Sequence, residues 1–101
     1  MASRLDLQVK LETILGTRHV YYQPPASVRM QYPAIVYSRS NIENQHADDG
    51  VYIQSYFYDL IVIDKDPDSE IVEKVSKLPG CRFNRHFTSE NLNHDVFTLY
   101  Y

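Results

Sequence analysis

The clearest hydrophobic pattern along the chain lies between Tyr52 and Asp64, where most residues are aromatic or β-branched. This composition predicts one long strand. Both of its faces are largely apolar, the odd one through Ile53, Phe57, Ile61 and Ile63 and the even one through Tyr56, Tyr58, Leu60 and Val62. Two apolar faces predict a central strand covered on both sides, or a bulge midway that exchanges the faces.

A helical period precedes that strand at the start of the chain. Ser3, with Asp6 three residues later, resembles a capping box, and Gly16 predicts the end of the helix. The apolar stripe between them consists of Leu7, Leu11, Ile14 and Leu15. Leu5 and Val9 fall on the opposite side. Either this helix is wedged between the sheet and a loop, or Leu5 and Val9 form a second stripe that awaits a neighbouring subunit.

A second helix is predicted directly after the long strand. Asp66 or Asp68 is expected to cap it, with Pro67 in its first turn and Pro79-Gly80 at its end. Its apolar stripe consists of Ile71, Val72, Val75 and Leu78.

The remaining segments predict four further strands. They are His19–Gln23 at a sheet edge before Pro24-Pro25, Ala34–Ser40 with a continuation through Ile42, Cys81–Thr88, and Asp95–Tyr101. Asn41–Gly50 is polar and predicts the extended tip of a hairpin, and residues 89–94 predict a turn. The order α-β-β-β-α-β-β indicates one α+β domain over residues 1–101. We expect a curved, mostly antiparallel sheet of about five strands with both helices on one face.

Composition narrows the class of protein. The 101 residues carry 10 basic against 13 acidic side chains, and a net charge of −3 leaves no electrostatic footprint for nucleic acid. One cysteine excludes an internal disulfide and fits a reducing compartment. No apolar run approaches the ~20 residues of a membrane span, and no signal peptide is recognisable, so we expect a cytosolic protein. Nine tyrosines suit interfaces as well as sheets.

The sequence gives only weak support for a catalytic or metal-binding site. Asp64, Asp66 and Asp68 imitate the start of a calcium loop, but Ser69 and Val75 stand where that loop needs Gly and Glu. Their expected role is helix capping.

We do not expect Cys81 to act as a nucleophile with His86 or His94, because separated residues of such common types are weak evidence. The two histidines also lack the ligand number and spacing of a zinc site. Arg82 and Arg85 beside two phenylalanines are the best nucleic-acid feature, and alternation along one strand explains them equally well. We therefore expect no catalytic, cofactor-binding or metal-binding residues.

Three blocks of sequence together resemble a known family: YPAIVY at Tyr32–Tyr37, YIQSYFYDLIVIDKDPDS at Tyr52–Ser69, and the closing NLNHDVFTLYY. They are similar to the tail-completion or tail-terminator proteins of long-tailed phages and Gram-positive prophages. The resemblance implies a structural virion protein, assembled in the cytoplasm of a bacterial host. It implies a homo-oligomeric ring, a hexamer in that family, which caps the tail tube and joins it to the head connector. Genome DNA would pass through the ring, without specific binding by the protein.

The ring implied by this resemblance needs surfaces that meet other copies and surfaces that meet partners. We expect the contact between subunits at Leu5, Val9, Tyr52 and Tyr56. We expect the lumen or partner loop at Asn44, Gln45, His46, Asp48 and Asp49. The alternative functions are a head–tail connector or minor capsid protein and, less favoured, a small enzyme or ligand-binding domain, which would need a deep pocket with convergent polar groups.

Overall fold

The computed structural model describes residues 4–25, 29–47 and 50–101, and for 45–47 and 50–55 it describes the backbone only. The elements are α1 (Arg4–Leu15), β1 (Val20–Tyr22), β2 (Ala34–Ala47), β3 (Gly50–Asp64), α2 (Glu70–Ser76), β4 (Cys81–Ser89) and β5 (Leu92–Tyr100). The predicted α+β class and the order of the elements are therefore confirmed. Neither helix in this part of the chain has the length and apolar character to cross a membrane.

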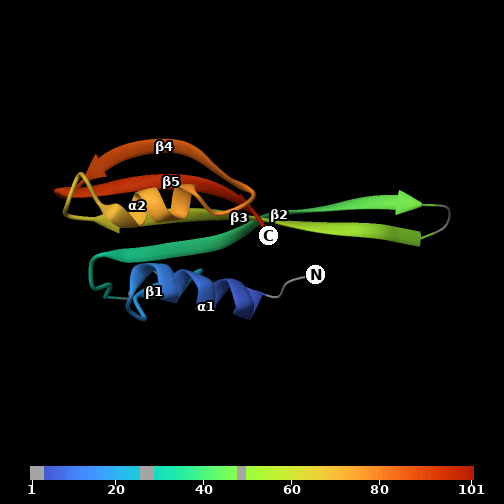
Figure 1. Ribbon diagram of the computed structural model, residues 1–101, viewed down its shortest axis with the longest axis horizontal. Coiled ribbons are helices and arrows are strands. Elements are labelled where there is room, and N and C mark those ends of the chain that lie inside the picture. The colour runs from blue at the N-terminus through green and yellow to red at the C-terminus, as the bar shows by residue number, and fades with distance from the viewer. Residues whose placement is uncertain (1–3, 26–28, 48–49) are drawn as a thin grey trace.

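The five strands form one open, mixed sheet in the order β1-β2-β3-β5-β4 (Figure 1). Only the short β1 runs parallel to its neighbour β2, and the other pairs are antiparallel. As expected from the prolines after it, β1 lies at one edge of the sheet, and β4 forms the other edge.

One hydrophobic core lies between the helices and one face of the sheet. Alternate residues of the three middle strands point to this face. The buried cluster combines Leu7, Leu11 and Leu15 of α1 and Val75 of α2 with Ile35, Tyr37, Tyr58, Leu60, Val62, Phe97 and Leu99 of the sheet. The predicted stripes of both helices thus supply the core.

The second face of the sheet is also apolar near its centre. Ala34, Ile63 and Val96 are buried there, whereas Ile61 remains half-buried. The register between β3 and β5 runs without a break from Phe57 to Asp64. The proposed exchange of faces by a bulge in β3 is therefore wrong for this part of the strand.

A hydrogen-bond network fastens α1 to the sheet. The hydroxyl of buried Tyr37 donates to Oε1 of Gln8 and accepts from Nη1 of Arg4 at 3.2 Å. Gln8 in turn donates to the carbonyl of Val20 at 3.1 Å. Burial raises the pKa of the Tyr37 hydroxyl above its ordinary 10.0, and nearby Arg4 opposes this shift.

Besides the end of α2, which falls at Ser76 and not at Pro79-Gly80, three predicted boundaries are wrong. Ser69, not Asp66 or Asp68, caps α2, because its hydroxyl accepts from the Ile71 amide at 3.3 Å, and Pro67 lies before the helix. The turn between β4 and β5 is confined to Glu90 and Asn91, both with positive φ, so β5 begins at Leu92.

The third wrong boundary concerns the polar tip predicted at Asn41–Gly50. It is mostly strand, since β2 continues to Ala47 opposite β3. Residues 48–49, within the predicted tip, lie outside the described residues.

The extended part of this hairpin forms an arm, which we define as residues 41–47 and 50–56. Pairing of β2 with β1 ends at Tyr37, and pairing of β3 with β5 ends at Phe57. Beyond those points the described residues of the two strands pair with each other, apart from the carbonyl of Tyr56, which accepts from the Tyr101 amide. The arm projects from the body (Figure 1), and the molecule measures 52 × 25 × 23 Å.

Candidate interaction surfaces

The outer side of α1 presents an exposed apolar pair. Leu5 and Val9 are each 63% exposed and lie one turn apart, on the side away from the buried leucines. Beside Val9 a shallow apolar hollow is lined by Ile14, Leu78 and Tyr101. The reading in which a loop covers this side of α1 is wrong for the described residues, because both side chains remain open to solvent. The alternative, in which Leu5 and Val9 form a second stripe for a neighbouring subunit, stays a prediction, and it requires the exposure that both side chains have.

The two tyrosines predicted for the same contact lie on the β3 half of the arm. Tyr56 is partly buried and packs against the core cluster, and its carbonyl accepts from the Tyr101 amide at 3.0 Å. It therefore supports the base of the arm. The side chain of Tyr52 lies outside the described residues.

The residues predicted for a partner loop lie on the arm. Asn44 is exposed on β2, and Gln45 and His46 continue the same strand, although their side chains are outside the described residues. Asp48 and Asp49 lie wholly outside them. Ile42, near the base, is 38% exposed. What was predicted as a loop is therefore presented, as far as Ala47, by a strand of defined register.

The edge strand β4 is a surface that sequence reasoning underestimated. Every β4 residue after Cys81 is exposed, and Phe83 is 57% exposed. A register shift between Phe83 and Arg85 inserts Asn84 as an extra residue. This bulge places Phe83 and Phe87 on opposite faces, whereas their spacing of four predicts the same face.

The same bulge brings the two arginines of β4 to one face. Arg82 pairs with Thr98 and Arg85 with Val96, so both point to the face away from the helices. The Arg85 guanidinium lies 5.5 Å from the centre of the Phe87 ring. The alternation of basic and aromatic residues was visible in the sequence, but no sequence signal gave the bulge.

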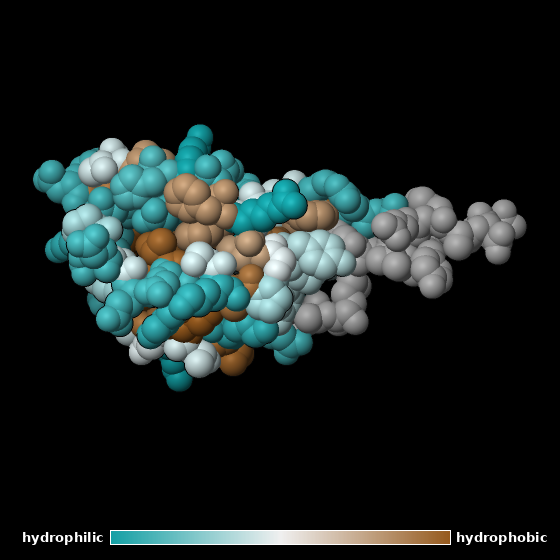
Figure 2. All heavy atoms as spheres, turned by 45° about the horizontal axis from the view of Figure 1, so that its top comes forward, coloured by the Kyte–Doolittle hydropathy of each residue, from teal (hydrophilic) through white to brown (hydrophobic). Residues whose placement is uncertain are grey.

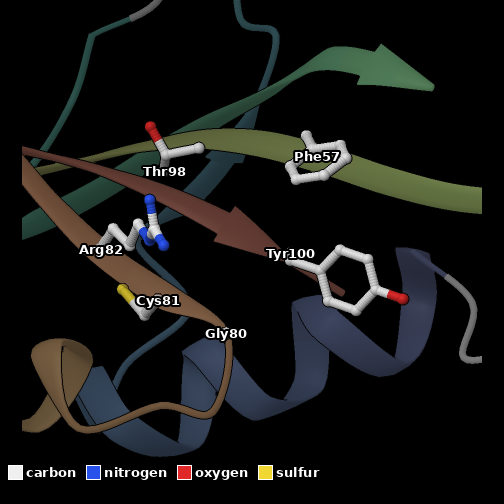
Figure 3. Close-up of a pocket in the computed structure, with 6 residues that line it drawn as sticks. All are labelled: Phe57, Gly80, Cys81, Arg82, Thr98 and Tyr100. Atoms are coloured by element: carbon white, nitrogen blue, oxygen red, sulfur yellow. The ribbon is translucent and has the colours of Figure 1, made fainter. Parts of the chain in front are cut away.

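A hollow between β3, β4 and β5 lies next to Arg82 (Figure 3). At one end the rings of Phe57 and Tyr100 meet edge to face with centroids 5.4 Å apart, and Arg82 and Thr98 lie at the other. Cys81 also borders it, and burial raises the pKa of its thiol above the ordinary 9.0. The thiol is therefore protonated at neutral pH, which disfavours nucleophilic chemistry.

The histidines do not converge on a shared site. Nδ1 of His86 lies 2.8 Å from Oδ1 of Asp95 on the helix side of the sheet, whereas His94 stacks on Phe87 at 4.6 Å on the other side. Within the described chain no serine, threonine or cysteine side chain is hydrogen-bonded to His86.

No described group of three or more His, Cys, Asp or Glu side chains has the geometry to hold a metal ion. The carboxylates of Asp64 and Asp66 accept instead from backbone amides two residues ahead.

Apolar side chains thus gather at several places on the surface of the body (Figure 2). The described residues offer surfaces for contact: the Leu5–Val9 pair, the arm and the edge strand β4. No protein-family model matches the sequence, and no curated protein matches it.

Proposed function

We propose that this protein is a structural component of a long-tailed phage or prophage virion, a tail terminator or completion protein. In this role it assembles as a ring on the end of the tail tube and joins the tail to the head connector. The observation that carries the proposal is the arm, a two-stranded hairpin that extends beyond the sheet. An isolated hairpin is marginally stable in water, so an arm of this length gains most from an assembly in which other chains support it.

The exposed apolar pair on α1 supports assembly independently. Transfer of a leucine and a valine side chain out of water is favourable by about 1.5–3 kcal/mol each when burial is complete. Leu5 and Val9 retain most of that gain for an intermolecular contact, because each is 63% exposed. We assign this pair to the contact between subunits, with Tyr52 and Tyr56 on the same side of the assembly.

The end of the arm is assigned to the lumen or to a partner protein. Residues 41–56 hold three acidic side chains and no lysine or arginine. An acidic, polar segment disfavours close binding of DNA phosphates, which fits a channel through which DNA passes without being held. The partners are then the tail-tube protein and the head connector.

Complementation of a phage that lacks the gene tests this proposal. Leu5→Glu combined with Val9→Glu should remove infectious particles while the purified monomer keeps its circular dichroism spectrum. Lys74→Glu is the matched control, since it lowers the net charge by the same two units at an exposed site of α2. Normal titres from the double variant would contradict the assignment of α1.

A second variant in the same experiment distinguishes a tail terminator from the alternative function, a head–tail connector or minor capsid protein. Shortening the arm beyond Asn44 should leave ring formation intact and should leave heads and tails unjoined in electron micrographs. A gene position beside the tail-tube gene favours a terminator, whereas one among the head genes favours a connector or minor capsid protein. Inability of the wild-type gene to restore any step of particle assembly would refute a virion role.

A further inference from the structure

The edge strand β4 leaves one side of its backbone without a neighbour. It spans Cys81–Ser89 at the end of the strand order, and within the described residues no strand lies on its outer side. The strand contains no proline, and eight of its nine residues are exposed. An exposed edge of this length is a template for an added strand, because its outward amide and carbonyl groups are available for a sheet ladder.

The charge of β4 determines which strand it accepts. Arg82 and Arg85 lie on one face, and the strand contains no acidic residue. Neither arginine forms an ion pair with another described residue. Two β4 strands placed side by side would bring like charges together, which disfavours pairing of β4 with itself. An acidic strand has no such penalty.

The arm offers such a strand on the free edge of β2. Ile42, Glu43 and Asn44 are exposed, and β1 ends its pairing with β2 at Tyr37. Glu43 makes no ion pair with another described residue, and the segment 41–56 contains no lysine or arginine. The arm and β4 therefore carry opposite charges, and each has an unpaired edge.

We propose that the β2 edge of the arm of one copy adds to β4 of the next copy as an antiparallel strand. This inference deepens the proposed ring, on which it rests for the head-to-tail arrangement of copies. Since the two edges differ, the contact is heterologous and can repeat from copy to copy until a ring closes.

The exposed side chains specify a register. Successive residues of a strand point to opposite faces. Placing Ile42 opposite Phe83 buries two exposed apolar side chains on the helix-side face. In an antiparallel pair this register also sets Glu43 opposite Arg82 on the other face, whereas a parallel pair would set Glu43 opposite the bulged Asn84.

Disulfide trapping between two different variants tests this register. In a Cys81→Ser background, Ile42→Cys and Phe83→Cys proteins are mixed in equal amounts and oxidised mildly. A covalent species that contains one copy of each is expected. Mixing Lys74→Cys with Phe83→Cys is the control, since Lys74 is exposed on α2 and belongs neither to the arm nor to the proposed subunit contact.

The other covalent products overturn the proposal. Phe83→Cys linked mainly to itself would show pairing of two β4 strands, and Ile42→Cys linked mainly to itself would show pairing of two arms. Equal yields from the Lys74 control would show random collision.

Charge exchange gives an independent measurement. Glu43→Arg and Arg82→Glu should each weaken self-association in sedimentation equilibrium, by about five- to tenfold for an exposed pair. The variant with both changes should recover most of the wild-type association, which general damage to the fold would not allow.

Wild-type protein that stays monomeric up to its solubility limit would overturn the strand contact. It would not by itself overturn the virion role, which complementation measures separately. Conversely, a trapped arm–β4 contact with no effect of the gene on phage particles would retain the contact and refute the virion role.

Discussion

Replacement of Tyr37 by phenylalanine isolates the polar link between α1 and the sheet. The ring of Tyr37 is fully buried in the core, and only its hydroxyl contacts Gln8 and Arg4. The variant keeps the ring and its packing, so any loss of stability reports the hydrogen bonds.

The expected loss follows from the partners that remain. A net hydrogen bond contributes about 0.5–1.5 kcal/mol, and a stranded buried partner adds about 1–3 kcal/mol. Gln8 and Arg4 are only partly buried and can turn toward water, so the second contribution stays small. We expect the free energy of unfolding to fall by about 1–2 kcal/mol, which for a domain of this size lowers Tm by about 5–15 °C.

Tyr58→Phe is the matched control. Tyr58 is 3% exposed and lies edge-on to Tyr37 at 6.0 Å, yet its hydroxyl makes no hydrogen bond with another described residue. Its replacement should change the free energy of unfolding by less than about 0.5 kcal/mol. Urea unfolding followed by circular dichroism measures both variants. Equal losses in the two, or no loss in Tyr37→Phe, would refute the role assigned to the network.

Three further predictions concern stability. Gly80→Ala should cost more than Gly16→Ala: both glycines have positive φ, of 79° and 80°, but an added Cβ meets the Tyr100 carbonyl oxygen at 2.6 Å only at Gly80. Equal melting temperatures of the two variants would contradict this. Ser69→Ala should lower the free energy of unfolding by about 1 kcal/mol through loss of the α2 cap, and Asp68→Ala by less; the reverse order in urea unfolding would restore Asp68 as the cap. Since burial holds the pKa of both Tyr37 and Tyr58 above 10.0, the folded state binds more protons than the unfolded state above pH 10. Stability should therefore fall as pH rises beyond 10, less steeply in Tyr37→Phe, and parallel pH profiles of the two proteins would argue against this origin.

The hydrophobic period of the sequence predicted the core residues correctly. Apolar side chains that repeat with the period of a helix or strand lie on one of its faces, and that face is the one buried against the rest of the protein. Leu7 and Leu11 were expected on one stripe of the N-terminal helix and are fully buried. The cap of α2 was placed wrongly because aspartate and serine are both good caps, and the choice depends on where the chain leaves β3. The β2 half of the arm was predicted as a loop because the segment Asn41–Gly50 is polar. Its strand conformation comes from pairing with β3, a non-local interaction that composition does not report.

The surface of β4 was the least predictable part. Whether Phe83 is exposed depends on its position at a sheet edge, which follows from the strand order. Which face it occupies depends on the bulge at Asn84, which follows from the register with β5. The strand order and the register are both tertiary properties. A prediction from the sequence alone knows neither of them and would place Phe83 and Phe87 on the same face of the strand.

The strand order has a consequence for how the chain acquires its structure during synthesis. β5 lies between β3 and β4, although it leaves the ribosome after both. Until residues 92–100 have emerged, β4 has no strand to pair with, and the β5 side of β3 is open along Phe57–Asp64. Phe57 meets Tyr100 across 43 residues of chain, and pairings this distant slow folding. The nascent chain therefore exposes its central strand until β5 has emerged, and chaperones that bind apolar strands have most to protect before that point.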